Sequence, residues 1–177
     1  MLYDLVQCTH RPQMDLFGDL KKRDAISPFV QLLWEKGLLY EAEIIADLDL
    51  PFLNLRGETG AEREALTYEA IHRRELLIYG GRIASGDLLG DPDLLRLEGD
   101  SYVAGDIKSG AGEEDDGSGP KLKKHYGVQI ALYTDILERK QLSTRREPFV
   151  WDIRGLEVTY ALDELTGKKD PTTLWKI

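Results

Sequence analysis

Three charged residues, Asp93, Asp106 and Lys108, could form a reactive site if the chain between them folds back on itself. A Gly-Asp dipeptide at 99–100 separates two apolar-rich runs, and this pattern predicts a β-hairpin with a two-residue turn. The register set by that turn places Asp93 opposite Asp106. Opposed residues of an antiparallel pair have their Cβ atoms about 4.5–5.5 Å apart. Two carboxylates so placed repel each other, which predicts a shared proton or a bound cation.

The same register places Asp91 opposite Lys108, so charges gather at the open end of a face that is apolar near the turn. This distribution is typical of a site rather than of a solvated strand. Opposed carboxylates suit a hard divalent cation, and the carbonyl of Ile107 could add an oxygen ligand. The Lys108 ammonium could orient or help deprotonate an attacking water, or stabilise charge on phosphoryl oxygens. Together these residues predict metal-assisted hydrolysis of a phosphodiester.

Two polar residues lie on the apolar faces of flanking helices. A helix over 28–45, begun by Ser27 as N-cap, carries Glu41 inside its apolar stripe. That stripe comprises Phe29, Val30, Leu33, Gly37, Tyr40 and Ile44. A helix over 122–139 places Gln129 beside Tyr133 on its core side. A buried amide needs hydrogen-bond partners, and a buried carboxylate needs a cation or a salt bridge to Arg or Lys.

The remaining segments alternate between helices and strands. A capping box beginning at Thr59 predicts a helix to about residue 74. Further strands are expected over 76–83, 147–153 and 156–161, and a short helix with a turn over 1–17. A Gly-, Ser- and acid-rich mobile loop is expected at about 109–121, and a loosely held polar tail at about 163–177. Local candidates for phosphate contact are Lys121, Lys123, Lys124 and His125.

Composition favours one soluble domain over residues 1–177, with 42% hydrophobic and 31% charged residues. The net charge of −9 argues against broad nonspecific binding to nucleic acid. Cys8 is the single cysteine, which excludes an intrachain disulfide and a cysteine-based metal cluster, and it is expected to be packed. No signal peptide and no apolar run of about 18 residues is present, so a cytoplasmic protein is expected.

Three segments in order resemble the RecB-like branch of the PD-(D/E)xK nuclease superfamily: Gly90-Asp-Pro-Asp93, Asp106-Ile-Lys108 and Gln129-Ile-Ala-Leu-Tyr133. Cys8-x-His-Arg11 and Gly37-x-x-Tyr-Glu41 also look like this branch, and the resemblance covers about residues 1–161. An Asp-x-Lys triplet alone arises often by chance, whereas the three segments in order are more specific. The resemblance implies an α/β, restriction-endonuclease-like core with a mixed central sheet of about four strands flanked by helices.

The resemblance also implies a metal-dependent deoxyribonuclease that acts on single- or double-stranded DNA. The Mg²⁺ or Mn²⁺ ligands that it implies are Glu41, Asp93, Asp106 and the carbonyl of Ile107. The catalytic residues that it implies are Asp93, Asp106, Lys108, Gln129 and Tyr133. Glu41 stands where many relatives carry a histidine, and the single cysteine excludes the iron–sulfur cluster of some relatives. No helicase is fused, so a minimal nuclease, a truncation or a subunit with a protein partner is expected.

Two other hypotheses fit the same residues. The chain could be a catalytically inactive nuclease-fold module that binds nucleic acid or a protein partner. The hairpin charges could instead form a structural ion-pair network in which Lys108 neutralises Asp91 and Asp106.

Overall fold

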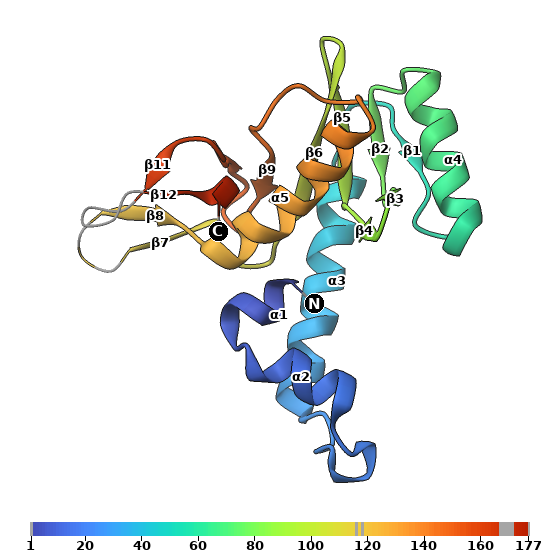
Figure 1. Ribbon diagram of the computed structural model, residues 1–177. Helices are drawn as coiled ribbons and strands as arrows, with labels where there is room; N and C mark the ends of the chain where they lie inside the picture. Colours follow the sequence, from blue (N-terminus) through green and yellow to red (C-terminus); the bar gives the residue numbers. More distant parts are fainter. Residues whose placement is uncertain (1, 116, 118, 167–171, 177) are drawn as a thin grey trace.

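The computed structural model describes residues 2–115, 117, 119–166 and 172–176. It is an α/β structure built on a mixed six-stranded sheet in the order β1-β2-β5-β6-β9-β10 (Figure 1). The strands of this sheet are β1 (Leu53–Asn54), β2 (Leu77–Tyr79), β5 (Leu94–Glu98), β6 (Ser101–Ile107), β9 (Phe149–Trp151) and β10 (Glu157–Thr159). The α-helices of the described residues are α1 (Leu2–Gln7), α2 (His10–Phe17), α3 (Pro28–Ala46), α4 (Gly60–His72) and α5 (Lys124–Arg139).

Three small hairpins and two 3₁₀ turns complete the described chain. The hairpins are β3 (Ile83–Ser85) with β4 (Leu88–Gly90), β7 (Glu113–Asp115) with β8 (Pro120–Leu122), and β11 (Leu165–Thr166) with β12 (Thr172–Thr173). The 3₁₀ turns are η1 (Leu20–Lys22) and η2 (Leu174–Lys176). Within the described residues, no helix has both the length and the apolar character needed to cross a membrane.

The predicted hairpin forms the centre of the sheet in the predicted register. Leu97 pairs with Tyr102, and the ladder continues as far as Leu94 opposite Gly105. Gly99 has a φ of +63°, a conformation that glycine adopts without the steric cost of a side chain. The strand β6 then pairs in parallel with β9, so α5 is the crossover between them. The four predicted central strands are present, but the strand predicted over 76–83 ends at Tyr79, and Ile83 belongs to β3 outside this sheet. The strand predicted over 156–161 is β10, and β10 and β1 form the edges of the sheet.

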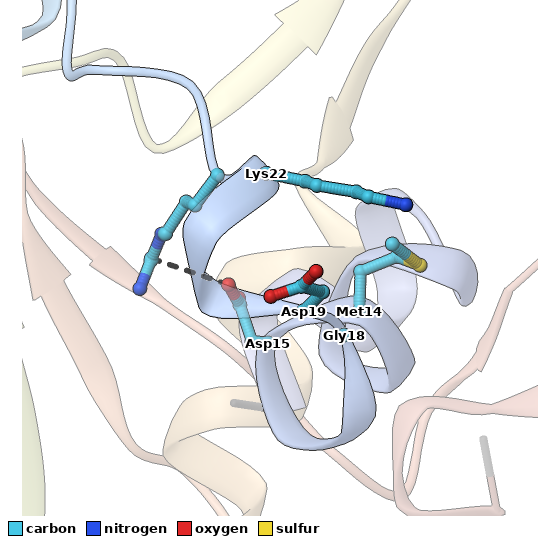
Figure 2. Close-up of a pocket in the computed structure, with 6 residues that line it drawn as sticks. Met14, Asp15, Gly18, Asp19 and Lys22 are labelled. Atoms are coloured by element: carbon cyan, nitrogen blue, oxygen red, sulfur yellow. Dashed lines mark ion pairs between the residues drawn. The ribbon is translucent and has the colours of Figure 1, made fainter.

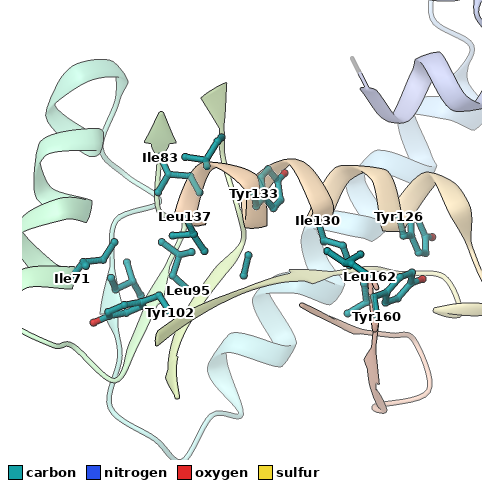
Figure 3. Packing of buried hydrophobic residues seen from close by; sticks show 14 of the residues in the cluster. Ile71, Ile83, Leu95, Tyr102, Tyr126, Ile130, Tyr133, Leu137, Tyr160 and Leu162 are labelled. Atoms are coloured by element: carbon teal, nitrogen blue, oxygen red, sulfur yellow. The ribbon is translucent and has the colours of Figure 1, made fainter. Parts of the chain in front are cut away.

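Helices cover both faces of this sheet (Figure 1). On one face, α4 and α5 pack over a cluster that contains Leu95, Tyr102 and Ile130 (Figure 3). On the opposite face, Ile45 of α3 packs in a second cluster that contains Ile107. Because side chains alternate along a strand, Asp106 shares the face of Tyr102 and lies on the side covered by α5.

The bounds predicted for α3 agree with the structure, but its apolar stripe is only partly covered. Tyr40 and Ile44 pack against the sheet, whereas Phe29 is 68% exposed and Leu33 is 50% exposed. The first half of α3 extends beyond the sheet (Figure 1), so the sheet cannot cover its side chains. Cys8 is also exposed rather than packed.

Three other expectations change. The interval 109–121 contains the antiparallel pair β7 and β8 rather than an irregular loop, although residues 116 and 118 lie outside the described residues. In the expected loose tail, Leu174 is buried in the core and the Trp175 N–H donates to the carbonyl of Leu162 at 3.0 Å. Residues 167–171 and 177 of that tail lie outside the described residues. Thr59 precedes α4 as predicted, but its side chain makes no capping hydrogen bond.

Candidate active site

Asp106 and Lys108 form an ion pair at the end of β6. Their positions two residues apart place both side chains on one face of the strand. Lys108 Nζ lies 2.9 Å from Asp106 Oδ2, and the Asp106 side chain is buried. This contact lacks hydrogen-bond geometry, so Oδ2 is a buried oxygen that has no hydrogen-bond partner among the described residues. The Lys108 N–H donates to the Trp151 carbonyl at 2.9 Å, which fixes the backbone here against β9.

Asp93 lies just before β5, where the confirmed register would place it opposite Asp106. Its Oδ2 accepts a hydrogen bond of 2.9 Å from the Ile107 N–H, and its side chain is 15% exposed. The N–H and C=O of one strand residue point to the same side, so the Ile107 carbonyl also points toward Asp93. Burial, followed by repulsion from Asp106 and Glu41, raises the pKa of Asp93 to about 7. The predicted carboxylate repulsion is therefore present in the structure.

A chain of hydrogen bonds connects Lys108 to α5. Lys108 Nζ donates to Gln129 Oε1 at 3.1 Å, and Gln129 Nε2 donates to the Tyr133 hydroxyl at 2.8 Å. The Tyr133 hydroxyl in turn contacts the Asp91 carbonyl at 3.4 Å. Burial, and then the charge of Asp106, raise the pKa of Tyr133, so its hydroxyl stays protonated. The amide predicted to need partners on the core side of its helix has them.

The Lys108 side chain remains a cation in this setting. Burial alone would lower its pKa, but the charges of Asp106 and Asp93 outweigh burial and raise it. A lysine whose pKa is raised is a poor proton acceptor at neutral pH. Its position therefore favours an electrostatic role over that of a general base.

Gly90 supports the Tyr133 ring from β4. A Cβ atom at Gly90 would lie 2.5 Å from Cδ1 of that ring, which is too close for any real contact. We expect Gly90→Ala to push the ring aside, weaken its bond to Gln129 and lower the free energy of unfolding by about 1–3 kcal/mol. Denaturant unfolding and activity assays check both effects.

Gly37→Ala is the matched control for this prediction. Its added Cβ would meet only Ser109 Oγ, at an ordinary 3.7 Å, inside a helix where alanine is favoured over glycine. Equal stability and activity of Gly90→Ala and the control would contradict the supporting role of Gly90.

Glu41 reaches the site from α3, on the other face of the sheet. Its buried carboxylate accepts a hydrogen bond of 2.9 Å from the Tyr79 hydroxyl. Arg56, which follows β1, places Nη2 2.8 Å from Glu41 Oε1 and Nη1 3.6 Å from Asp93 Oδ1. Sequence reasoning missed Arg56. Its guanidinium connects the acid of α3 to the acid of the hairpin.

The predicted contact between Asp91 and Lys108 is absent. Asp91 is paired instead with Arg63 and, at 3.3 Å, with Arg82, and its side chain is 44% exposed. Pro92 follows Asp91 and has no N–H to continue the ladder, which ends at Leu94. The charges of Asp91 are thus compensated away from Lys108.

Of the predicted basic residues, Lys123 lies beside the site. Its Nζ is 5.3 Å from the centre of the Tyr126 ring, and Lys108 Nζ is 5.5 Å from the same centre. Both ammonium groups are therefore held near one aromatic ring at the start of α5.

The residues that gather here fit a hard divalent cation by their chemistry. Carboxylate and carbonyl oxygens are the ligands that Mg²⁺ and Mn²⁺ prefer, and Asp106 Oδ2 is buried without a hydrogen bond. In the described part of the chain, however, no three His, Cys, Asp or Glu side chains converge closely enough to hold one ion. Arg56 and Lys108 lie among the acids and compensate their charge.

Two surface hollows were compared with this site. One, of about 130 Å³, lies at the end of α2 and beside η1, and a 3.2 Å ion pair between Arg23 and Asp15 borders it (Figure 2). None of the predicted site residues lines it. A second, of about 350 Å³, is lined by Leu33, Lys36, Leu39, Tyr40, Glu43, Ser109 and Ile153. None of the predicted site residues lines this second hollow either, although Ser109 directly follows Lys108 in the sequence.

A scan against protein-family models and a search of curated proteins both give no match for this chain.

Proposed function

We propose that this protein is a divalent-metal-dependent nuclease that hydrolyses DNA phosphodiester bonds, with a RecB-like PD-(D/E)xK core of the restriction-endonuclease type. One observation carries the proposal: Asp106 and Lys108 of the hairpin and the Gln129–Tyr133 pair of α5 form a single connected polar network. Their segments are separate in the sequence and resemble the nuclease pattern in order. The succession of α3, β2, the β5–β6 hairpin, α5 and β9 supports the same core.

The residues of this network would divide the work of hydrolysis. Asp93, Asp106 and the Ile107 carbonyl would hold Mg²⁺ or Mn²⁺. Glu41 would complete the set of ligands only after a local rearrangement, because the three acids do not converge on one point among the described residues. When bound, such an ion would polarise a phosphoryl oxygen and lower the pKa of a bound water. The Lys108 ammonium would stabilise the negative charge that develops on the phosphate.

Gln129 and Tyr133 would keep the Lys108 ammonium in position. The Gln129 carbonyl oxygen accepts from Lys108, and its amide nitrogen is turned toward Tyr133 by the hydroxyl there. This arrangement fixes the amide orientation that Lys108 needs. Lys123, whose Nζ lies near the Tyr126 ring, would contact a neighbouring phosphate of the substrate.

The acidic net charge of −9 bears on how DNA is delivered. A nuclease without a broad basic surface gains little nonspecific affinity for DNA, because that affinity comes from Lys and Arg on phosphates. Delivery by a protein partner, or by a larger protein that contains this domain, agrees with that charge.

The test is incubation of the protein with linear and with circular DNA in Mn²⁺ or Mg²⁺, beside the same reactions in EDTA. We expect cleavage only with the metal, and its loss in Asp106→Asn, which removes a charge and keeps the side-chain shape. Cleavage that survives EDTA, or equal activity of wild type and Asp106→Asn, would contradict the proposal.

A non-catalytic module is the second candidate, because Arg56 and Lys108 already compensate the acids as an ion-pair network would. Binding of DNA without any cleavage in either metal would favour it. Asp106→Asn would then change stability alone.

A further inference from the structure

We propose that the Arg56 guanidinium occupies the position of a cation between Glu41 and Asp93. A divalent ion must displace this guanidinium before it can bind the two carboxylates. The inference rests on the proposed metal-dependent function. Arg56 would thereby lower the affinity of the site for a divalent ion.

The contacts of the guanidinium carry the inference. Arg56 Nη2 lies 2.8 Å and 2.9 Å from the two carboxylate oxygens of Glu41, and Nη1 lies 3.6 Å from Asp93 Oδ1. Glu41 belongs to α3, which covers one face of the sheet, whereas Asp93 directly precedes β5 within the sheet. The planar fork of arginine reaches both acids. Burial would lower the pKa of Arg56, but Glu41 and Asp93 outweigh burial and raise it.

The structure also holds the Arg56 backbone in place. Gly80 has a φ of +70°, and a Cβ there would lie only 3.0 Å from Arg56 Cα and 3.1 Å from its Cδ. The Arg56 N–H donates to Asn54 Oδ1 at 2.9 Å. The Tyr79 hydroxyl donates to Glu41, and the Tyr79 ring centre is 5.8 Å from the guanidinium carbon. The guanidinium is therefore aimed at the two acids by its surroundings, although its side chain is 36% exposed.

Two consequences follow from this position. A carboxylate oxygen that binds Mg²⁺ or Mn²⁺ at about 2.1 Å cannot keep a guanidinium in the same direction. Arg56 should therefore weaken metal binding. Without metal it should stabilise the fold, because its removal leaves the buried Glu41 carboxylate with the Tyr79 hydroxyl as a donor but without its cation. A purely structural arginine would have the second effect but not the first.

The experiment compares wild type with Arg56→Gln, using Mn²⁺ alone as the probe and no DNA. Calorimetric titration should show that Arg56→Gln binds Mn²⁺ about tenfold more tightly, a factor equal to about 1.4 kcal/mol. Thermal unfolding should show a lower Tm for Arg56→Gln in EDTA and a smaller difference at saturating Mn²⁺, since the ion binds the variant better. Neither readout involves DNA cleavage.

Arg82→Gln is the matched control, because it removes the same charge from the neighbouring Asp91. Its Mn²⁺ affinity should stay within about twofold of wild type, since that pair is exposed and screened. Arg56→Lys serves as the second variant should Arg56→Gln fail to fold. Lysine keeps the charge but cannot span both acids, so its affinity should fall between wild type and the glutamine variant.

Unchanged or weaker Mn²⁺ binding by the Arg56 variants would overturn the inference, as would an equal Tm loss with and without Mn²⁺. A wild type that cuts DNA in Mn²⁺ while these variants fail the tests would overturn the inference alone. A wild type that cuts no DNA would contradict the proposed function, and the binding comparison would still decide the inference. If neither wild type nor the Arg56 variants bind Mn²⁺, the proposed function and this inference are both wrong.

Discussion

Replacement of Lys108 by methionine is expected to slow metal-dependent DNA cleavage by about 10²–10³-fold, the usual cost of one well-placed electrostatic group. Methionine fills a similar volume, so the packing against Tyr126 should persist, whereas loss of the cation beside the buried Asp106 should lower the free energy of unfolding. Mn²⁺ binding should be no weaker than in wild type, because the substitution removes the cation paired with Asp106. Initial cleavage rates, measured beside Mn²⁺ titrations, separate the two effects.

Lys140→Met is the control for Lys108→Met. Its Nζ also lies over an aromatic ring, 5.2 Å from the centre of Tyr68, but it contacts none of the acids of the site. The control should cleave DNA at nearly the wild-type rate. A Lys108→Met protein that retains a third or more of wild-type activity would show that the ammonium is not catalytic.

The second large effect concerns pH in the absence of metal. The pKa of Asp93 rises from an ordinary 3.8 when unfolded to about 7 when folded. The folded state therefore holds a proton that the unfolded state releases, so Asp93 favours folding most below pH 4, and this contribution is lost as the pH rises through 7. The loss amounts to up to about 4 kcal/mol in the free energy of unfolding. Urea unfolding in EDTA across this range measures it.

Asp93→Asn isolates this contribution from the other titrating groups. Asparagine keeps an acceptor for the Ile107 N–H but has no charge to repel Asp106. The variant should match wild type near pH 4.5 and exceed it in stability at pH 8. Asp91→Asn, which alters an exposed acid paired with arginines, should not show this rise. A stability difference that is independent of pH would contradict the raised pKa of Asp93.

The sequence predicts the register of the β5–β6 hairpin well because local rules determine it. A two-residue turn at Gly99 sets the pairing of β5 and β6, and the pairing sets the approach of Asp93 to Asp106. Gln129 could be identified because an amide on a core face must find partners, and Lys108 and Tyr133 supply them.

The role of Arg56 could not be predicted from the sequence. Arg56 follows an irregular stretch without hydrophobic periodicity, and its partners Glu41 and Asp93 are distant in the sequence. Only the packing of α3 against the sheet brings these residues together. Similarly, the apolar stripe of α3 predicts one face of a helix but not which element packs against that face. Phe29 is exposed because the first half of α3 extends beyond the sheet. The register does not extend to Asp91 because the ladder ends at Leu94, and Pro92 has no N–H with which to continue it.

The parallel pairing of β6 with β9 has a consequence for biosynthesis. The strand β6, which carries Asp106, pairs with β5 on one side and with β9 on the other. Because β9 follows α5 in the sequence, β6 gains this second neighbour only after all of α5 has been made. Until then one side of an apolar strand is an open edge, which is the kind of surface that pairs with other chains. A chain that ends before β9 would therefore expose an edge prone to aggregation. The order of synthesis thus delays completion of the candidate site until β9 has been made.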